Sequence, residues 1–309
     1  MTLDSKVLGI VCVVSAVIVF TLQDVTMKWL SGSYALHQIV FVRSIIAMSV
    51  TIGIVHLEGG LRIVKSARVG LLLVRGSLTI IANSCYFLAL AVMSIAEASA
   101  VFFVAPLFIT ALSALVLKET VGVRRWSAVA VGLAGVVVML RPGGDTFRLI
   151  ALLPLLAAGA YAVMQILTRQ LGRTEKASTI ALYTQFVMLS FSGCMYLVVG
   201  DGRYAPDDNA SLAFLLREWT IPVFVDGLLL TGIGVLNAIG GYLISQAYRL
   251  AQAAVLAPFE YIAMPLGVTA GFVVFGNFPD KLTWVGITLI LGSGLYVLHR
   301  ERVSRQKRG

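Results

Sequence analysis

Three charged residues lie within apolar stretches of the first fifty residues, where an ionised side chain costs about 2.5–3.5 kcal/mol on insertion scales. Asp24 and Lys28 are one helical turn apart and therefore share a helix face. Arg43 lies in the next apolar stretch. If both stretches are helices that rise 1.5 Å per residue, Asp24 and Arg43 each lie roughly 9–10 Å from the helix ends that the short turn between them connects. We expect one charged cluster. Two roles stay open for it: a structural ion pair between the two helices, or a substrate anchor or proton-sensitive site.

Glu260 is a fourth charged residue inside an apolar stretch. It stands next to Tyr261 and shortly after Pro258, and its own stretch contains no basic residue. A buried carboxyl group without a cation nearby favours its protonated form. Two interpretations are open: the group binds substrate or a proton, or it pairs with a residue of a neighbouring helix such as Arg249.

Amides, phenols and a phenyl ring complete the candidate substrate-binding set. Amides and phenols hydrogen-bond substrates, but they also join helices to one another, so both roles stay open for them. The aromatic rings are expected to stack on the apolar part of a substrate. The full set is Asp24, Lys28, Arg43, Asn83, Tyr86, Phe102, Tyr161, Gln165, Gln185, Asn237, Tyr242, Glu260 and Tyr261. Arg75 and Glu97 lie near helix ends and are expected to extend toward the membrane surface.

The sequence contains no recognisable catalytic machinery. Its histidines and cysteines are His37, His56, His299, Cys12, Cys85 and Cys194. They form no metal-ligand spacing and no disulfide framework, and neither a His-Glu-x-x-His nor a Gly-x-Ser-x-Gly element is present. A phosphate-cradling loop is also missing, which argues against an ATPase. We therefore expect no catalytic residue, no metal and no cofactor.

The overall composition is that of a protein whose solvent is lipid. Of the 309 residues, 59% are hydrophobic and only 13% are charged, and the mean hydropathy is +0.92. Soluble domains carry about 25% charged residues. The net charge of +9 does not indicate a nucleic-acid partner, because the basic residues lie at helix ends, mostly on one side. The composition predicts an all-α integral membrane protein.

Ten stretches are long enough to span a bilayer, which requires about 20 mostly apolar residues. They are residues 6–30, 36–56, 69–92, 95–117, 124–141, 148–171, 177–199, 220–248, 253–275 and 281–299. Turn residues such as Gly59-Gly60 and Pro142-Gly143-Gly144 separate them. The first stretch continues through Asp24 and Lys28 without a small-residue cleavage site, so we interpret it as a spanning helix rather than a leader.

Lysine and arginine positions predict the orientation. With a cytoplasmic N-terminus, 16 of the 24 basic residues fall on inner segments, five on outer segments and three within helices. Cytoplasmic segments of membrane proteins carry such an excess. We therefore expect both termini in the cytoplasm, with residues 300–309 as a basic tail.

The two halves of the chain share an ordered series of positions. The paired positions are Asp24 with Gln165, Arg43 with Gln185, Tyr86 with Tyr242, and Pro106 with Pro265. Each pair comes from one helix of each half and the order is the same, which indicates a duplicated five-helix unit. An odd number of spans inverts the second copy, an architecture typical of secondary transporters. We expect one repeat in residues 1–142 and the other in residues 146–299.

Several short segments accompany the doubled unit, namely Ala96-Glu97-Ala98 through Pro106 to Leu117-Lys118-Glu119, then Arg125-Trp126 and Gly135. Together with that unit they resemble the EamA-type drug/metabolite transporter superfamily over essentially the whole chain. Two others are similar to the S-adenosylmethionine uptake branch, namely Asp24-Val25-Thr26-Met27-Lys28 and Pro258-Phe259-Glu260-Tyr261 through Asn277-Phe278-Pro279-Asp280-Lys281. Glu260 and Asn277 depart from that branch, where a basic residue and a glutamate are expected.

We therefore expect a secondary active transporter of the bacterial inner membrane that works by alternating access around a central cavity. Spans 1–4 and 6–9 would line the cavity, and spans 5 and 10 would brace it. The substrate would be a small polar metabolite, cofactor-like or nucleoside-like, such as S-adenosylmethionine or riboflavin, with a proton or counter-substrate coupled to it. The alternatives are an exporter of amino acids or drug-like metabolites with the same fold, a passive channel, and an intramembrane enzyme. The sequence leaves the direction of transport and the oligomeric state open.

Overall fold

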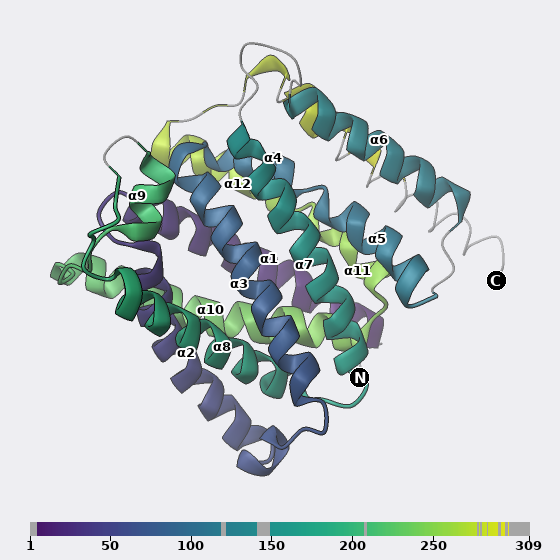
Figure 1. Ribbon diagram of the computed structural model, residues 1–309. Coiled ribbons are helices and arrows are strands. Elements are labelled where there is room, and N and C mark those ends of the chain that lie inside the picture. The colour runs from purple at the N-terminus through teal and green to yellow at the C-terminus, as the bar shows by residue number, and fades with distance from the viewer. Residues whose placement is uncertain are drawn as a thin grey trace.

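The computed structural model is helical throughout its described part (Figure 1). It describes residues 5–118, 122–140, 149–206, 209–276, 278, 280–282, 284–289, 292–293 and 296. Within those ranges every regular element is an α-helix or a 3₁₀ helix, as the composition predicts for an all-α protein. The expected repeat boundary, the tail 300–309, and Glu119 and Asn277 lie outside the described residues.

The helix boundaries follow the expected spans closely. The helices are α1 (Ser5–Leu30), α2 (Leu36–Glu58), η1 (Leu61–Val64), α3 (Val69–Val92), α4 (Ile95–Phe102), α5 (Ala105–Val116), α6 (Val123–Leu140), η2 (Leu149–Ala151), α7 (Leu152–Leu171), α8 (Ala177–Val199), α9 (Ala210–Leu216), α10 (Phe224–Leu250), α11 (Ala253–Glu260) and α12 (Ala263–Phe275). Among the described residues, seven helical segments are long and apolar enough to cross a membrane, with α4 and α5 contributing one segment from Glu97 to Val116.

Proline interrupts the fourth and ninth expected spans at corresponding places. Pro106 lies in the first turn of α5, just after α4 ends at Phe102. Pro265 lies in the first turn of α12, just after α11 ends at Glu260. Proline lacks an N–H and its ring clashes with the carbonyl four residues earlier. Each span is therefore split into two helices joined by a two-residue turn.

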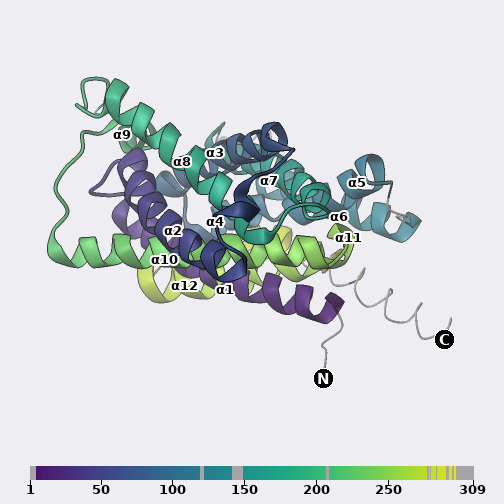
Figure 2. The same cartoon turned by 90° about the horizontal axis from the view of Figure 1, so that it is seen from below.

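Eight helices form a closed ring. α1 packs on α10, α10 on α2, α2 on α8, α8 on α3, α3 on α7, α7 on α5, α5 on α11, and α11 on α1. Figure 2 shows α1, α10 and α12 on one side of the bundle and α3, α7 and α8 on the other. α6 packs on α5 and α4 and stands at the edge of the bundle in Figure 1.

Two glycines allow helices of opposite halves to approach closely. A Cβ atom on Gly76 of α3 would lie 2.8 Å from Cγ2 of Val187 on α8. A Cβ atom on Gly234 of α10 would lie 2.6 Å from Cβ of Ile46 on α2. In each case the third helix of one half meets the second helix of the other half. The two contacts are therefore counterparts in the expected repeats.

Hydrogen bonds tie the halves together at the end of the bundle where α1 leads into α2. The Tyr34 hydroxyl donates to Oδ2 of Asp226 at 2.7 Å, and Nε2 of Gln38 donates to the carbonyl of Thr220 at 2.5 Å. Tyr34 lies in the connecting turn, where its hydrogen bond to Asp226 raises its pKa above the ordinary value. We call these the α1–α2 end contacts.

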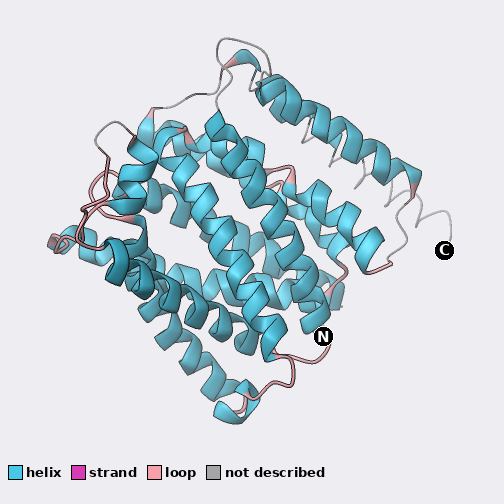
Figure 3. Cartoon of the chain, viewed as in Figure 1, coloured by secondary structure: helices cyan, strands magenta, loops and turns pink. Residues whose placement is uncertain are grey.

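A second set joins the halves at the opposite end, where α2 leads into α3 through the loops seen in Figure 3. Glu58 accepts a hydrogen bond from the Tyr242 hydroxyl at 2.6 Å on Oε1 and from the Ser178 hydroxyl at 2.6 Å on Oε2. The Ser66 hydroxyl donates to Oε1 of Glu175 at 2.7 Å. These are the α2–α3 end contacts.

Candidate functional site

A cavity of about 180 Å³ lies inside the helical ring. Its lining comes from α1, α3, α4, α7, α8, α10, α11 and α12, and so from both halves of the chain. The second span, α2, was expected among the lining helices but contributes no lining residue, because it packs on α8 and α10 instead. Eight of the candidate residues line the cavity: Asp24, Asn83, Tyr86, Phe102, Tyr161, Gln185, Asn237 and Glu260.

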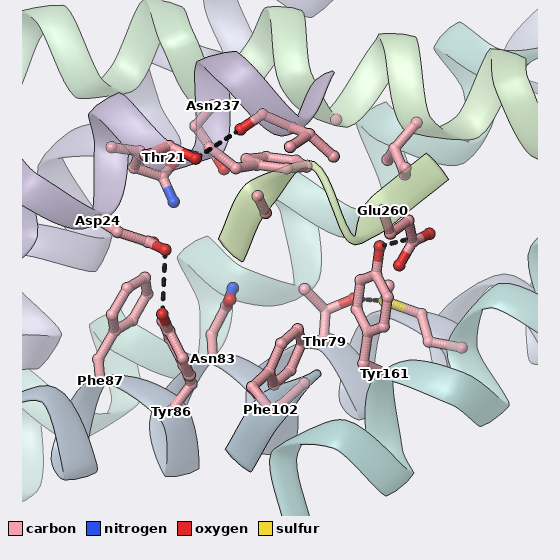
Figure 4. A pocket seen from close by; sticks show the side chains of 18 of the residues that line it. Thr21, Asp24, Thr79, Asn83, Tyr86, Phe87, Phe102, Tyr161, Asn237 and Glu260 are labelled. Atoms are coloured by element: carbon pink, nitrogen blue, oxygen red, sulfur yellow. Dashed lines mark hydrogen bonds between the residues drawn. The ribbon is translucent and has the colours of Figure 1, made fainter. Parts of the chain in front are cut away.

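Asp24 lies on one side of the cavity in Figure 4, directly opposite Tyr86. Its Oδ2 accepts a hydrogen bond from the Tyr86 hydroxyl at 3.1 Å, and the same phenol oxygen lies 3.0 Å from Oγ of Ser99. Because a phenol carries a single proton, Ser99 is the donor to Tyr86 when Tyr86 donates to Asp24. The other carboxylate oxygen of Asp24 has no hydrogen-bond partner among the described residues and is available to a ligand.

Glu260 lies on the other side of the cavity in Figure 4, beside Tyr161. The Tyr248 hydroxyl donates to its Oε1 at 2.5 Å and the Tyr161 hydroxyl donates to the same oxygen at 3.3 Å. Neither Arg249 nor another basic residue of the described structure forms an ion pair with it. The carboxyl group is therefore held by two phenols rather than by a cation.

A row of aromatic rings runs between the two carboxyl groups. Ring centroids are 5.6 Å apart for Phe87 and Tyr86, 5.1 Å for Tyr86 and Phe102, and 5.3 Å for Phe102 and Tyr161. Figure 4 shows Phe102 lying between Tyr86 and Tyr161. Tilted and edge contacts at these separations are the favourable ones for aromatic pairs. The row offers stacking positions to a planar ligand.

Amide groups contribute neutral donors and acceptors to the lining. Nδ2 of Asn237 donates to Oε1 of Gln185 at 3.1 Å, which joins α10 to α8. Asn83 projects toward the cavity between the two carboxyl groups in Figure 4. Oε1 of Gln23 is buried without a hydrogen-bond partner among the described residues, and Gln23 also lines the cavity.

Arg75 lines the cavity, contrary to the expectation that it extends toward the membrane surface. Its side chain is only 3% exposed. Nε donates to Oγ1 of Thr168 at 2.7 Å, one terminal nitrogen donates to Oγ1 of Thr184, and the other lies 3.5 Å from Oγ of Ser245. The expectation failed because Arg75 faces α7, α8 and α10 rather than lipid.

The expected cluster of Asp24, Lys28 and Arg43 is formed only in part, because Asp24 and Arg43 interact electrostatically whereas Lys28 has other partners. Nζ of Lys28 donates to the carbonyls of Leu90 and Met93 at 2.9 and 2.7 Å, and so closes the C-terminal end of α3. Arg43 is fully buried beside the Phe87 ring, with its guanidinium carbon 5.4 Å from the ring centroid. Lys28 is therefore separated from Asp24 although the two share a helix face, while Asp24 and Arg43 remain within electrostatic reach of each other.

Three further candidates lie outside the cavity lining. Gln165 is fully buried within the packing of α7. Tyr242 belongs to the α2–α3 end contacts through Glu58. Tyr261 packs against Phe103, with ring centroids 6.2 Å apart. Glu97, expected near the membrane surface, forms a capping box with Ser94 at the start of α4.

Sequence reasoning missed the hydroxyl groups of the lining. Ser99, Thr184 and Ser245 all line the cavity. The available signal was position, since Thr184 precedes the candidate Gln185 and Ser245 lies less than one turn beyond Tyr242. Within the described ranges, no group of three or more histidine, cysteine, aspartate or glutamate side chains is placed to hold a metal ion.

Known proteins whose sequences are similar to this chain are transporters. Residues 7–141 match the model of the EamA-like transporter family. The riboflavin transporter of Vibrio cholerae is 31% identical over 250 residues, covering 79% of this chain and 76% of that protein. The S-adenosylmethionine uptake transporter of Rickettsia prowazekii is 24% identical over 296 residues, covering 96% of this chain and 94% of that protein.

A crystal structure of another protein shares the fold. It superposes with a TM-score of 0.68 at 18% sequence identity and covers 97% of this chain and 98% of that chain. At this identity the likeness concerns the arrangement of the helices alone.

Proposed function

The chain belongs to the EamA-like transporter family of the drug/metabolite transporter superfamily, and we propose that it is a secondary active transporter of a cofactor-like or nucleoside-like metabolite. It is a multi-pass membrane protein that transports small metabolites rather than an enzyme. Its proposed location is the bacterial inner membrane.

The observation that carries the proposal is the composition of the cavity wall. Two carboxyl groups, Asp24 and Glu260, are placed on opposite sides of a row of aromatic rings, with amides between them. Such a wall suits a ligand that combines a planar heterocycle with polar or cationic groups, because rings stack and carboxylates accept charge-assisted hydrogen bonds. S-adenosylmethionine and riboflavin, the substrates named for the two relatives, both contain such a heterocycle.

The proposed topology is ten spans in two inverted five-helix repeats, residues 1–142 and 146–299, with both termini in the cytoplasm. Three features support it: the proline breaks after Phe102 and Glu260, the paired contacts of Gly76 and Gly234, and a ring in which helices of the two halves alternate in matching order. In transporters with inverted repeats the substrate site lies near mid-membrane, where the repeats meet.

The proposed mechanism is alternating access by rocking of the two halves. Opening toward one side requires the loss of the α1–α2 end contacts, and opening toward the other requires the loss of the α2–α3 end contacts. Glu260 is the proposed carrier of a coupling proton, since phenols rather than a cation hold its carboxyl group. Exchange for a counter-substrate is the alternative form of coupling.

The test of the substrate site is uptake of radiolabelled S-adenosylmethionine and riboflavin into proteoliposomes, with Asp24→Asn as the variant. We expect the wild type to transport at least one of them and Asp24→Asn to lose at least about tenfold in uptake, since a charge-assisted hydrogen bond contributes about 1.5–3 kcal/mol. Asp201→Asn is the matched control, because Asp201 is half exposed in the loop after α8 and pairs with Arg203.

Thermal unfolding provides the folding control. A ligand that binds the folded state raises the unfolding temperature, so the wild type and Asp201→Asn should be stabilised by the transported compound and Asp24→Asn should not. Undiminished uptake by a folded Asp24→Asn protein would remove Asp24 from the binding site.

A further inference from the structure

Arg75 is a buried cation with no counterion among the residues that the structure describes. Its side chain is 3% exposed on α3, and it forms no ion pair with any carboxylate among the described residues. A charged side chain inside a membrane protein is costly unless it is paired, so such residues mark substrate or ion pathways. The partners of Arg75 are three neutral hydroxyl groups, which satisfy hydrogen bonds but do not cancel its charge.

The three hydroxyls have only acceptor capacity left for Arg75. Each hydroxyl carries one proton, and each proton is already donated to a backbone carbonyl one turn earlier in its own helix. Thr168 donates to Met164 at 2.8 Å, Thr184 to Ile180 at 2.8 Å, and Ser245 to Gly241 at 2.7 Å. The lone pairs that remain face the guanidinium group, so α7, α8 and α10 together hold it in one orientation.

Two donors of the guanidinium group have no partner within the described part of the chain. A guanidinium group has five N–H bonds, and the three hydroxyls account for one on each nitrogen. One N–H is therefore left on each terminal nitrogen, in a residue that lines the cavity. A guanidinium group that donates from two of its nitrogens can bind a carboxylate or phosphate through both oxygens.

We propose that Arg75 is the anion-binding residue of the cavity and that the transported molecule carries a carboxylate together with cationic groups. The inference rests on the proposed function, because it assigns the substrate class of that same cavity. Arg75 receives the anionic group, Asp24 receives a cationic one, and the aromatic row receives the heterocycle. This pattern of charge fits a zwitterion of the S-adenosylmethionine type and does not fit the uncharged riboflavin.

A purely structural role makes a different prediction. If Arg75 only joins α3 to α7, α8 and α10, its replacement lowers the affinity for every ligand alike. If it binds an anion, its replacement lowers the affinity only for ligands that carry one. The deciding readout is therefore a ratio of affinities for two ligands that differ in a single carboxylate.

The experiment measures inhibition of labelled S-adenosylmethionine uptake into proteoliposomes by unlabelled S-adenosylmethionine and by its decarboxylated derivative. For the wild type we expect the decarboxylated compound to bind about tenfold to a hundredfold more weakly, since hydrogen bonds to charged groups are the strong ones. In Arg75→Gln the two compounds should bind equally. In Arg75→Lys, which keeps the charge but loses the paired donors, an intermediate ratio is expected.

The ratio of the two affinities can be measured on the wild type alone. It therefore tests the proposal even if Arg75→Gln does not fold. Equal binding of the two compounds by the wild type would overturn the proposal, as would a wild-type ratio that Arg75→Gln preserves. A protein that transports riboflavin but not S-adenosylmethionine would overturn the proposed anion site while leaving the proposed function intact. Uptake of neither compound would contradict the proposed function itself, and the anion site with it.

Discussion

Asp24 and Glu260 are both carboxyl groups of one cavity, but their hydrogen bonds suit them to different tasks. Asp24 accepts from a single phenol, Tyr86, at 3.1 Å, which leaves most of its lone pairs for a ligand. Glu260 accepts from two phenols on one oxygen, and the Tyr248 hydroxyl is only 2.5 Å away. A group whose partners belong to the protein keeps them whether or not substrate is bound. Glu260 is therefore the better candidate for a proton that moves separately from the substrate.

Glu260→Gln is expected to separate coupling from binding. Glutamine keeps the size and the acceptor oxygen for the phenols but cannot take up a proton. Accumulation driven by a proton gradient should therefore fall to the level measured without a gradient, while exchange of internal for external substrate continues. The measurement compares gradient-driven uptake with counterflow in the same proteoliposomes.

Asp24→Asn is the contrasting variant in that comparison, because it should lose uptake and counterflow together. Continued gradient-driven accumulation by Glu260→Gln would show that the proton is carried elsewhere. Equal loss of both activities in the two variants would place Glu260 in the substrate site instead.

At the scale of elements, the contact of α10 with α2 depends on the absence of a side chain at Gly234. Its Cβ position lies 2.6 Å from Cβ of Ile46 and 3.1 Å from the carbonyl oxygen of Arg43, and the latter atom cannot move without moving the helix. Gly232, two residues earlier on α10, has nothing within 4 Å of its Cβ position. The same helix therefore provides a test position and a control.

Gly234→Ala is expected to destabilise the protein by about 1–3 kcal/mol through overpacking, whereas Gly232→Ala should be neutral or stabilising by up to about 1 kcal/mol through helix propensity. The unfolding temperature of each purified variant in detergent gives the comparison. A lower unfolding temperature for Gly232→Ala than for Gly234→Ala would contradict the close packing of α10 on α2.

Element positions were predictable from the sequence because length and apolarity alone decide them. The first nine expected spans coincide with described helices to within a few residues, and Pro106 and Pro265 mark the two breaks. The rotation of each helix about its own axis was not predictable, because it depends on packing partners far away in the chain. For this reason the predicted surroundings of Arg75 and Lys28 were wrong. Arg75 faces α7 and α8 instead of the membrane surface, and Lys28 reaches the end of α3 instead of a cluster with Asp24.

Candidate site residues were predictable to a similar extent. A polar or aromatic side chain inside an apolar span is unusual enough to attract attention, and this selected Asp24, Tyr86 and Glu260. Serine and threonine give no such signal, because they commonly bond to their own helix backbone in spans. Thr184 and Ser245 do so here while also serving the cavity.

For the whole molecule, the proposed mechanism makes the two sets of end contacts decide the balance between the states open to either side. Tyr34 bonds Asp226 at one end, and Tyr242 bonds Glu58 at the other. A typical hydrogen bond contributes about 0.5–1.5 kcal/mol, which corresponds to a roughly twofold to tenfold change in an equilibrium between two states. Loss of one contact should therefore favour opening at that end.

Tyr34→Phe and Tyr242→Phe are expected to shift this equilibrium in opposite directions. The readout is the labelling rate of a cysteine introduced by Asn83→Cys, with the native Cys12, Cys85 and Cys194 replaced, using a membrane-impermeant reagent on either side of oriented vesicles. One variant should speed labelling from one side and the other variant from the opposite side. Equal shifts toward one side in both variants would reject the assignment of the two contacts to opposite ends.

The two longest helices are neighbours, and their length relates the protein to the thickness of its membrane. α1 has 26 residues and α10 has 27, so each extends about 39–40 Å at 1.5 Å per residue, whereas the hydrocarbon core is about 30 Å thick. The pair must tilt or carry its ends into the headgroup region. Because α1 and α10 come from different halves of the chain, the acyl-chain length of the lipid acts on an interface that moves in the proposed rocking mechanism.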